Sequence, residues 1–391
     1  MKYKWRELSL GEITELVIDH RGKTPKKLGG DWSKGGYRAL SAKNIKTGRI
    51  VQPDTIRFVR EEMYHKWMKD EIQQGDIIIT SEAPFGQVLY WDSKEKVVLS
   101  QRLFGVRIRE EYDSRFVYYY MTTSDFQGEM AGRATGTTVV GLRQPELLKC
   151  VVRCPDLETQ KRIATILASI DEKILINEQI NENLEQQAKS LFTEMFDSKE
   201  SNFWKQGVLS DIAEITMGQS PSGNSYNENG QGTVFFQGRA EFGFRFPTIR
   251  LFTSEPKRIA QKNDTLMSVR APVGDLNVAH EECCIGRGLA AIHSKDNHQS
   301  FVHYTMFFLH RELDVFNGEG TVFGSINRNA LNSMPIRVPP IDLMDKFENI
   351  VSPMDKLIRT NFDEICHLQA IRDSILPKLM AGEIDLSKIK P

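Results

Sequence analysis

The chain has 391 residues, and its 51 basic and 52 acidic side chains leave a formal net charge of −1. The hydrophobic fraction of 40% and the charged fraction of 26% are those of a soluble globular protein, and the length predicts two or three domains. This balance does not indicate a nucleic-acid binder, which usually carries a basic excess. It does not exclude one either, because local patches matter more than the sum.

The sequence carries no signal for a membrane, a disulfide framework or a metal. No stretch reaches the eighteen or more apolar residues of a membrane helix, and the first seven residues lack the apolar core of an export signal. The five cysteines are an odd number without Cys-x-x-Cys spacing, and the eight histidines form no His-Glu-x-x-His pair. We therefore expect a cytoplasmic protein with no membrane partner and no metal site.

The second half of the chain repeats the first. Asp76 opens a run that reaches Ala-Pro-Phe-Gly at residues 83–86, and Asp264 opens one that reaches Ala-Pro-Val-Gly at 271–274, a separation of 264 − 76 = 188 residues. Two copies are too few for a solenoid. We predict an α+β protein with pseudo-two-fold symmetry, built from two similar globular domains, each followed by a long helix. Later matches have a separation of 337 − 153 = 184: Arg153 with Arg337, Asp171 with Asp355, Asn177 with Asn361, Leu184 with Leu368 and Ser190 with Ser374.

The first predicted region, residues 1–156, is globular and rich in strands. Residues 77–79 and 97–99 are apolar runs bounded by turn residues, which is typical of strands. Residues 116–121 read as a helix.

The second predicted region, residues 157–197, is helical. Alternating steps of four and three from Ile163 give ten positions, of which eight are apolar, and this heptad seam is typical of packed helices. The pattern predicts a short helix at about 158–167, a break, and a long helix at about 169–196. The expected contact positions on this helix are Ile170, Ile174, Asn177, Leu184 and Leu191.

The third predicted region, residues 198–339, is the second globular copy. Residues 218–232 are rich in Gly, Ser and Asn, which predicts a loop. Residues 301–306 match the expected helix of the first copy and predict another helix.

The fourth predicted region, residues 340–391, repeats the helical seam. A short helix at about 341–351 and a long one at about 353–381 are expected, because Ser352 suits a helix cap and Pro353 suits the first helical position. Gly382 is the expected stop. Two helices with matching apolar stripes most simply pack on one another as an antiparallel spacer, which is favoured over a solvated linker. The contact positions here are Met354, Ile358, Asn361, Leu368 and Ile375.

Several segments of both halves together resemble one family. They are the domain openings at 10–13 with 22–25 and at 209–213 with 218–221, the strand and turn at 235–239, the helix entry at 155–164 and the C-terminal run at 376–384. In this repeated order they resemble the specificity subunit of type I restriction–modification systems, over the whole chain. Residues 339–342, Pro-Pro-Ile-Asp, depart from the pattern, since no Glu-Gln pair follows them.

The resemblance implies a division of labour between subunits. Residues 1–156 and 198–339 become two target-recognition domains, each reading one half of a split duplex DNA sequence, and 157–197 and 340–391 become conserved helical regions. Two methylation subunits, which bind S-adenosylmethionine, would dock on the helices, and restriction subunits, which use ATP and Mg²⁺, would join for cleavage. No cofactor is expected on this chain itself.

The residues themselves offer no catalytic site. A methylase of exocyclic amino groups needs an Asn/Asp-Pro-Pro-aromatic loop, and the sequence has none. Gly22-Lys23-Thr24 is not a phosphate-binding loop, because Val17 stands where the first glycine belongs. A nuclease-like set of acids around Asp171 is not preserved in the second copy. We therefore expect a non-enzymatic subunit.

Candidate DNA contacts are polar loop residues beside Gly or Pro, since Arg, Lys, Asn, Gln and Thr supply most phosphate and base contacts. In the first copy they are Arg21, Lys23, Lys43, Asn44, Gln101, Arg102, Thr137 and Arg143. In the second copy they are Gln219, Gln237, Arg239, Arg270, Arg287, Thr321, Asn327 and Arg328.

The favoured interpretation is a subunit that recognises an asymmetric bipartite sequence and positions partner methyltransferase and restriction subunits. Two alternatives stay open: a specificity subunit of a related two-part restriction system, and a scaffold whose two domains bind proteins instead of DNA. Salt-dependent affinity for bipartite duplex DNA separates the first two from the scaffold.

Overall fold

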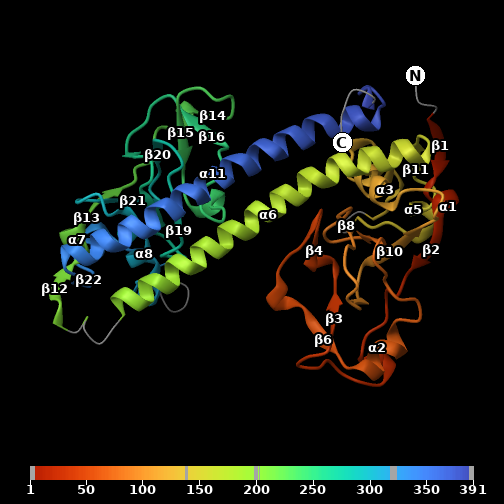
Figure 1. The fold of residues 1–391 in the computed structure, drawn as a ribbon, viewed down its shortest axis with the longest axis horizontal. Helices are drawn as coiled ribbons and strands as arrows, with labels where there is room; N and C mark the ends of the chain where they lie inside the picture. The colour runs from red at the N-terminus through yellow and green to blue at the C-terminus, as the bar shows by residue number, and fades with distance from the viewer. Residues whose placement is uncertain (1–4, 137–139, 198–200, 202, 318–323, 387–391) are drawn as a thin grey trace. The chain divides into compact units, whose positions relative to one another are not determined.

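The computed structural model describes residues 5–136, 140–197, 201, 203–317 and 324–386. The chain divides into two compact units, a first unit made of Met1–Ile174 with Cys366–Pro391 and a second unit made of Leu175–Ile365 (Figure 1). Both boundaries fall inside the long helices, so each unit contains part of each helix. The four-region division drawn from the sequence stays a prediction.

The first unit is built on a four-stranded antiparallel sheet. Its strand order is β2-β10-β7-β8, and the strands are β2 (Thr14–Ile18), β10 (Leu103–Ile108), β7 (Ile77–Thr80) and β8 (Val88–Tyr90). A second sheet has the order β6-β3-β9, from β6 (Arg57–Val59), β3 (Tyr37–Leu40) and β9 (Val98–Leu99). Two further pairs are β1 (Arg6–Ser9) with β11 (Val151–Cys154) and β4 (Ile45–Lys46) with β5 (Arg49–Ile50).

The second unit repeats this topology. Its four-stranded antiparallel sheet has the order β13-β21-β18-β19, from β13 (Ala213–Met217), β21 (Leu289–Ser294), β18 (Thr265–Ser268) and β19 (Leu276–Val278). Its other sheet has the order β14-β16-β15-β20-β17, from β14 (Tyr226–Asn227), β16 (Leu251–Thr253), β15 (Thr233–Phe236), β20 (Cys283–Ile285) and β17 (Ile259–Ala260). The pair β1–β11 recurs as β12 (Lys205–Val208) with β22 (Pro335–Val338).

The repeat predicted from spacing is therefore a repeat of strand pairing. In each unit one parallel pair, β3 with β9 and β15 with β20, sits among antiparallel neighbours. The expected strand at 77–79 is confirmed as β7, every residue of which is buried, and the run at 97–99 contains β9. Residues 218–232 are not entirely loop, because β14 within them pairs with β16.

Asp76 and Asp264 recur because each closes a turn before the same strand of the sheet. Asp76 accepts the amide hydrogen of Gln73, and Asp264 accepts that of Gln261, both at 2.8 Å. Each carboxylate then contacts a nitrogen-bearing side chain on the neighbouring strand: Arg107 Nη2 lies 2.9 Å from Asp76, and a ring nitrogen of His293 lies 2.6 Å from Asp264. Burial raises the pKa of the Asp264 carboxyl, and the contact with His293 opposes that rise.

Short helices cover the sheets. Those of the first unit are α1 (Leu10–Ile13), α2 (Glu61–Trp67), α3 (Ser114–Met121), α4 (Ser124–Arg133) and α5 (Gln144–Leu147). Those of the second are α7 (Leu209–Ile212), α8 (Gln299–Phe308), α9 (His310–Asp314) and α10 (Arg328–Asn332). The two helices expected at 116–121 and 301–306 are confirmed as α3 and α8.

Each long helix is a single unbroken element. The structure shows α6 (Leu157–Phe196) and α11 (Ile341–Met380), each of 40 residues, where the sequence predicted a short helix, a break and a long helix. The predicted breaks are wrong because Ser169 bonds the carbonyl of Ile166 and stays helical, and α11 continues through Pro353. A 40-residue helix is about 60 Å long at 1.5 Å per residue, longer than either long helix expected from the sequence.

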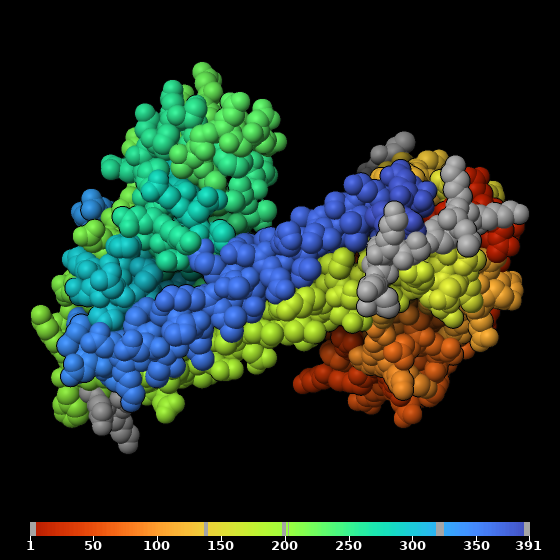
Figure 2. Space-filling view, turned by 45° about the horizontal axis from the view of Figure 1, so that its top comes forward, coloured from red at the N-terminus to blue at the C-terminus, as the bar shows by residue number. Residues whose placement is uncertain are grey.

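The two long helices pack antiparallel along the predicted seam (Figure 2). In the first unit Arg372 bonds Asp171, and in the second unit Glu364 bonds Asn177, so residue numbers fall on one helix as they rise on the other. None of the ten expected contact positions is exposed. Asn361 pairs with Asn181 rather than with Asn177, its counterpart in the repeat.

Helix α11 ends where the sequence predicted. Gly382 has a φ of 72°, a left-handed conformation that favours glycine. Its amide donates to Leu379, and the amide of Glu383 donates to Lys378, the two bonds of a Schellman cap. Among the described residues, no helix is long and apolar enough to cross a membrane.

Candidate DNA interface

In the first unit, loops at the ends of both sheets meet at one edge. The amide of Ser81 donates to Arg102 at 2.8 Å, the amide of Ala42 donates to Gln101 at 3.2 Å, and the amide of Leu142 donates to Ser81 at 3.0 Å. These backbone bonds bring the loops 41–44, 81–86, 100–102 and 141–143 together. Of the candidates they carry, the exposed ones are Lys43, Gln101, Arg102 and Arg143.

A hollow of about 420 Å³ opens at this edge, here called the Arg102 hollow. Three cations and an indole contribute to its wall, and none of the residues that line it is acidic. The guanidinium of Arg57 stacks over the Trp32 ring at 5.1 Å, which holds one of the cations in place. The lining residues are Trp32, Ala39, Ser41, Ala42, Lys43, Thr55, Arg57, Ala83, Ser100, Gln101 and Arg102.

Three first-unit candidates turn inward instead. Asn44 is 1% exposed, and its side-chain amide bonds Thr55 at 3.0 Å and the carbonyls of the adjoining turn. The ammonium of Lys23 donates to the Trp67 carbonyl at 2.7 Å, and burial lowers its pKa. Arg21 pairs with Asp19 and stacks on a phenylalanine ring. These side chains have partners within the first unit, and their contact with DNA stays a prediction.

The corresponding edge of the second unit is also assembled from strand-end loops. The amide of Gln219 donates to Ile285 at 3.0 Å, the amide of Gly288 donates to Gln237 at 3.3 Å, and the amide of Ile326 donates to Val269 at 3.1 Å. A Cβ at Gly218 would lie 2.1 Å from the carbonyl oxygen of Gly286, so glycine is required for these loops to approach.

The second-unit candidates in the described residues are all exposed on these loops. Two of them have partners within the chain: Arg239 forms an ion pair with Asp275, and Asn327 caps α10 by accepting the amide of Ala330 at 2.9 Å. The exposed set is Gln219, Gln237, Arg239, Arg270, Arg287, Asn327 and Arg328. Thr137 and Thr321 lie outside the described residues.

The sequence reasoning missed the residues that complete the hollow. Arg57 is on β6 and Trp32 precedes β3, and neither lies beside the Gly or Pro that guided the choice of candidates. Glu82 was also missed, although its carboxylate lies 3.0 Å from Arg102 Nε. The Ala-Pro-x-Gly repeat that follows Glu82 was the one signal that pointed to this loop.

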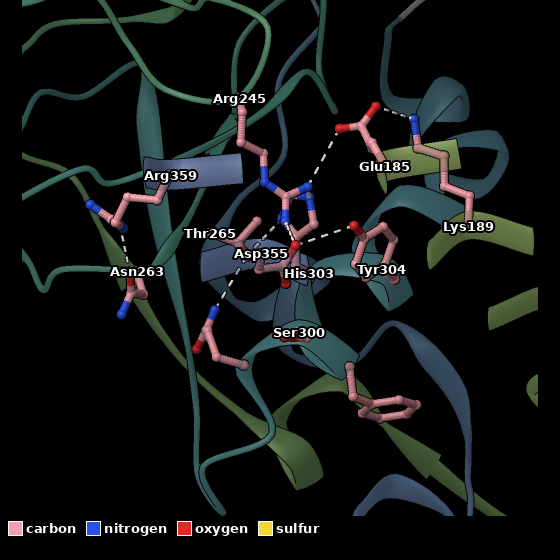
Figure 3. Close-up of polar contacts among 12 residues, drawn as sticks. Glu185, Lys189, Arg245, Asn263, Thr265, Ser300, His303, Tyr304, Asp355 and Arg359 are labelled. Carbon is pink, nitrogen blue, oxygen red and sulfur yellow. Dashed lines mark hydrogen bonds and ion pairs between the residues drawn. The ribbon is translucent and has the colours of Figure 1, made fainter. Parts of the chain in front are cut away.

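Within the second unit, the globular part is joined to the long helices by a buried charge cluster around Arg245 (Figure 3). Arg245 is 5% exposed, and its guanidinium lies 2.6 Å from Asp355 on α11 and 3.4 Å from Glu185 on α6. It also bonds a ring nitrogen of His303 at 2.6 Å. Because His303 lies on α8, Arg245 connects α8 of the globular domain to both long helices.

The same cluster sets the protonation of its members. Burial, and then the nearby Arg245, hold the pKa of His303 well below its ordinary value. The neutral ring suits the geometry, since Arg245 donates to one nitrogen and Thr265 lies 3.2 Å from the other. Burial also raises the pKa of Glu348, which accepts the amides of Ser300 and Phe301 at the start of α8.

In the first unit, Asp171 takes the place of Asp355. It accepts the hydroxyl of Tyr119 on α3 at 2.7 Å and a guanidinium nitrogen of Arg372 on α11 at 2.9 Å. Burial and the nearby Asp171 raise the pKa of Tyr119, so its hydroxyl stays protonated and donates. Within the described part of the chain, no group of three or more His, Cys, Asp or Glu side chains is placed to hold a metal ion.

Comparison with known proteins gives a consistent result. Residues 2–186 and 202–365 both match the type I restriction modification DNA specificity domain. The putative type I restriction enzyme MjaX specificity subunit of Methanocaldococcus jannaschii is 30% identical to this chain over an alignment of 411 residues, gaps included. The alignment covers 97% of this chain and 93% of that protein. The MjaIX specificity subunit of the same organism is 23% identical and covers 81% of this chain and 79% of its own length.

A solved structure shares the fold. The type I restriction–modification S subunit from M. genitalium aligns with a TM-score of 0.63 at 17% sequence identity, over 97% of this chain and 96% of that one. At this identity the likeness concerns the fold alone, and it matches the two-copy architecture described above.

Proposed function

Because this chain belongs to the type I restriction–modification DNA specificity family, and carries the DNA specificity domain twice, we propose that its two loop edges read the two halves of an asymmetric bipartite duplex sequence. One observation supports the asymmetry above all others. The loop edges are built from equivalent strands, yet Glu82 and Arg102 of the first unit correspond to Arg270 and Gly288 of the second. Different side chains at equivalent places select different bases.

Selection of bound DNA tests this directly. The full chain, with the subunits that co-purify with it, is incubated with a random duplex library, and the retained DNA is sequenced at two salt concentrations. The expected product is two unlike half-sites with unread bases between them, bound more weakly as salt rises because phosphate contacts release counterions. A contiguous motif, or salt-independent retention, contradicts the proposal. The comparisons favour neither the related two-part system nor the protein scaffold.

We propose further that this chain is not itself an enzyme and acts in the cytoplasm. Methyl transfer would belong to two methylation subunits with S-adenosylmethionine, and cleavage to restriction subunits with ATP and Mg²⁺. The absence of the methylase loop from the sequence supports this division. Purified chain with its target duplex and labelled S-adenosylmethionine should transfer no methyl group, and it should hydrolyse no ATP. Turnover without a second subunit would overturn this part of the proposal.

The long helices are proposed to set the spacing of the half-sites and to receive the methylation subunits. Both run without a break from one unit into the other, which suits a spacer. Deleting four residues from each helix in register removes about 6 Å, and the selected spacer should shorten by a base pair or two. A spacer of unchanged length would contradict this role.

The partner surface has its own test. Replacing Ile174 and Leu368 by Asp buries unpaired charges in the seam, so it should disrupt the helix pair and prevent subunit assembly. Light scattering measures the mass of the complex. Replacing the exposed Gln179 and His367 by Ala serves as the control for changes in the helices that leave the seam intact. Full assembly of the Asp variant would contradict a buried seam.

A further inference from the structure

The Arg102 hollow combines three features that a surface loop does not usually share. Arg102 adopts a φ of 67°, a left-handed conformation that is uncommon for residues other than glycine, asparagine and aspartate. Its side chain is 46% exposed at the mouth of a concave site. The Nε atom of Arg102 lies 3.0 Å from the carboxylate of Glu82 and forms an ion pair with it. Such a backbone conformation persists where the surroundings impose it, and it is concentrated at binding sites.

The Glu82 contact orients the guanidinium. An arginine held at Nε has one edge engaged, and its two terminal nitrogens form the planar fork that matches paired acceptors. In the major groove, the O6 and N7 atoms of guanine are such a pair, and a bidentate arginine is their most common specific partner. The lining residues Lys43 and Arg57 add positive charge, and Gln101 adds a side chain that can both donate and accept.

We propose that Arg102, oriented by Glu82, is a specificity-determining residue that reads a single guanine in the half-site bound by the first unit. This inference rests on the proposed function, since it names one base contact within that bipartite recognition. The second unit has no such contact at the equivalent place: Gly288 precedes β21 as Arg102 precedes β10, and Arg270 stands where Glu82 does.

The test uses two substitutions with different consequences. Arg102→Gly removes the side chain and suits the left-handed backbone, so the fold is retained. Arg102→Lys keeps the charge and removes the fork. Both variants should lose preference for guanine at one position by about 5- to 150-fold, while the other half-site is unchanged. Arg109→Lys is the matched control, because Arg109 is exposed one residue past the other end of β10.

Library selection with the full chain and its co-purifying subunits gives the readout, and thermal unfolding checks that each variant is folded. A phosphate contact would appear as a uniform loss of affinity for Arg102→Gly, with the salt slope reduced by about one and little change for Arg102→Lys. That result, or an unchanged base preference in both variants, overturns the inference. If the wild-type chain selects no bipartite sequence, the proposed function fails first, and the two failures are thereby distinguished.

Discussion

In each unit the globular domain contacts the long helices through an aspartate at the same place in the repeat, but the cation beside that aspartate differs. Asp171 and Asp355 both accept a tyrosine hydroxyl from the domain helix, from Tyr119 at 2.7 Å and from Tyr304 at 3.3 Å. The cation beside Asp171 is Arg372, which comes from the opposite long helix. The cation beside Asp355 is Arg245, which comes from the globular domain.

The two arrangements differ in how deeply the cation is buried. Arg372 and Asp171 are each 31% exposed, whereas Arg245 is 5% exposed and is shared between Asp355 and Glu185. The repeat explains the exchange: the place of Arg372 is taken in the second unit by Ala188 on the other long helix, which is fully buried and carries no charge. The repeated spacing thus keeps an aspartate at the same place in both units, while the burial of the cation beside it differs.

The largest expected effect is at Arg245. Replacing it by Ala leaves Asp355 without its cation at a largely buried site, while Glu185 keeps only Lys189, and this should cost the second unit about 3–5 kcal/mol in unfolding free energy. Urea denaturation followed by hydrogen exchange of the α8 amides measures this loss. Arg245→Lys should restore part of it, and the α3 amides of the first unit should be unaffected. A loss below 1 kcal/mol would show that the cluster is hydrated in solution.

A smaller effect is expected where the seam of the second unit is polar. Asn361 donates to Asn181 at 2.8 Å, and Asn181 donates to the Ile358 carbonyl at 3.3 Å. Asn361→Leu leaves a buried acceptor without its donor and should cost about 1–3 kcal/mol. The double variant with Asn181→Leu should recover this loss at the expense of helix register. A double-mutant cycle in urea is the measurement, and additive losses would show that the two side chains do not interact.

These cases show how far the sequence can be read. Heptad spacing predicted the contact positions of both long helices, from Ile170 to Leu191 and from Met354 to Ile375, because burial on a helix follows a period. It could not predict that Asn361 pairs with Asn181, since this depends on the offset between two antiparallel helices. Nor could it assign Arg245, Arg57 or Trp32, which lie far in sequence from their partners. Polar residues beside glycine located the loop edges, but Asn44 has the same local pattern and is buried.

The pH dependence of stability should also distinguish the units. His303 is held neutral in the folded state, where Arg245, Lys189 and Thr265 surround it. Its first-unit counterpart is Tyr118, which does not titrate near neutrality because burial raises the pKa of its hydroxyl to about 12. Below its ordinary pKa of 6.5, the unfolded histidine binds a proton that the folded one does not. Stability therefore falls as pH falls, by at most about 1.4 kcal/mol per unit.

The measurement is urea denaturation at pH 6.5 and 5.5, read by exchange of the α8 amides. His303→Gln should remove most of the slope. Burial raises the pKa values of Asp264 and Glu348, but both residues are present in the wild type and in the His303→Gln variant. Their contributions to the slope therefore cancel when the two are compared. An equal slope in the variant would mean that other groups carry the dependence.

The smallest effect is expected at Arg372, and it is the sharpest test of the comparison. This ion pair is partly hydrated, so Coulomb attraction is weak and the ordering of two side chains opposes it; exposed pairs contribute about 0.2–1 kcal/mol. Arg372→Ala should therefore lower the unfolding free energy of the first unit by no more than about 1 kcal/mol. This small loss is expected even though its partner, Asp171, matches Asp355 of the buried cluster in the repeat. Urea denaturation, read by exchange of the α3 amides, should show Arg372→Ala close to wild type while Arg245→Ala is not. Equal losses in the two variants would mean that the helix aspartate, rather than the burial of its cation, decides how strongly each domain is held.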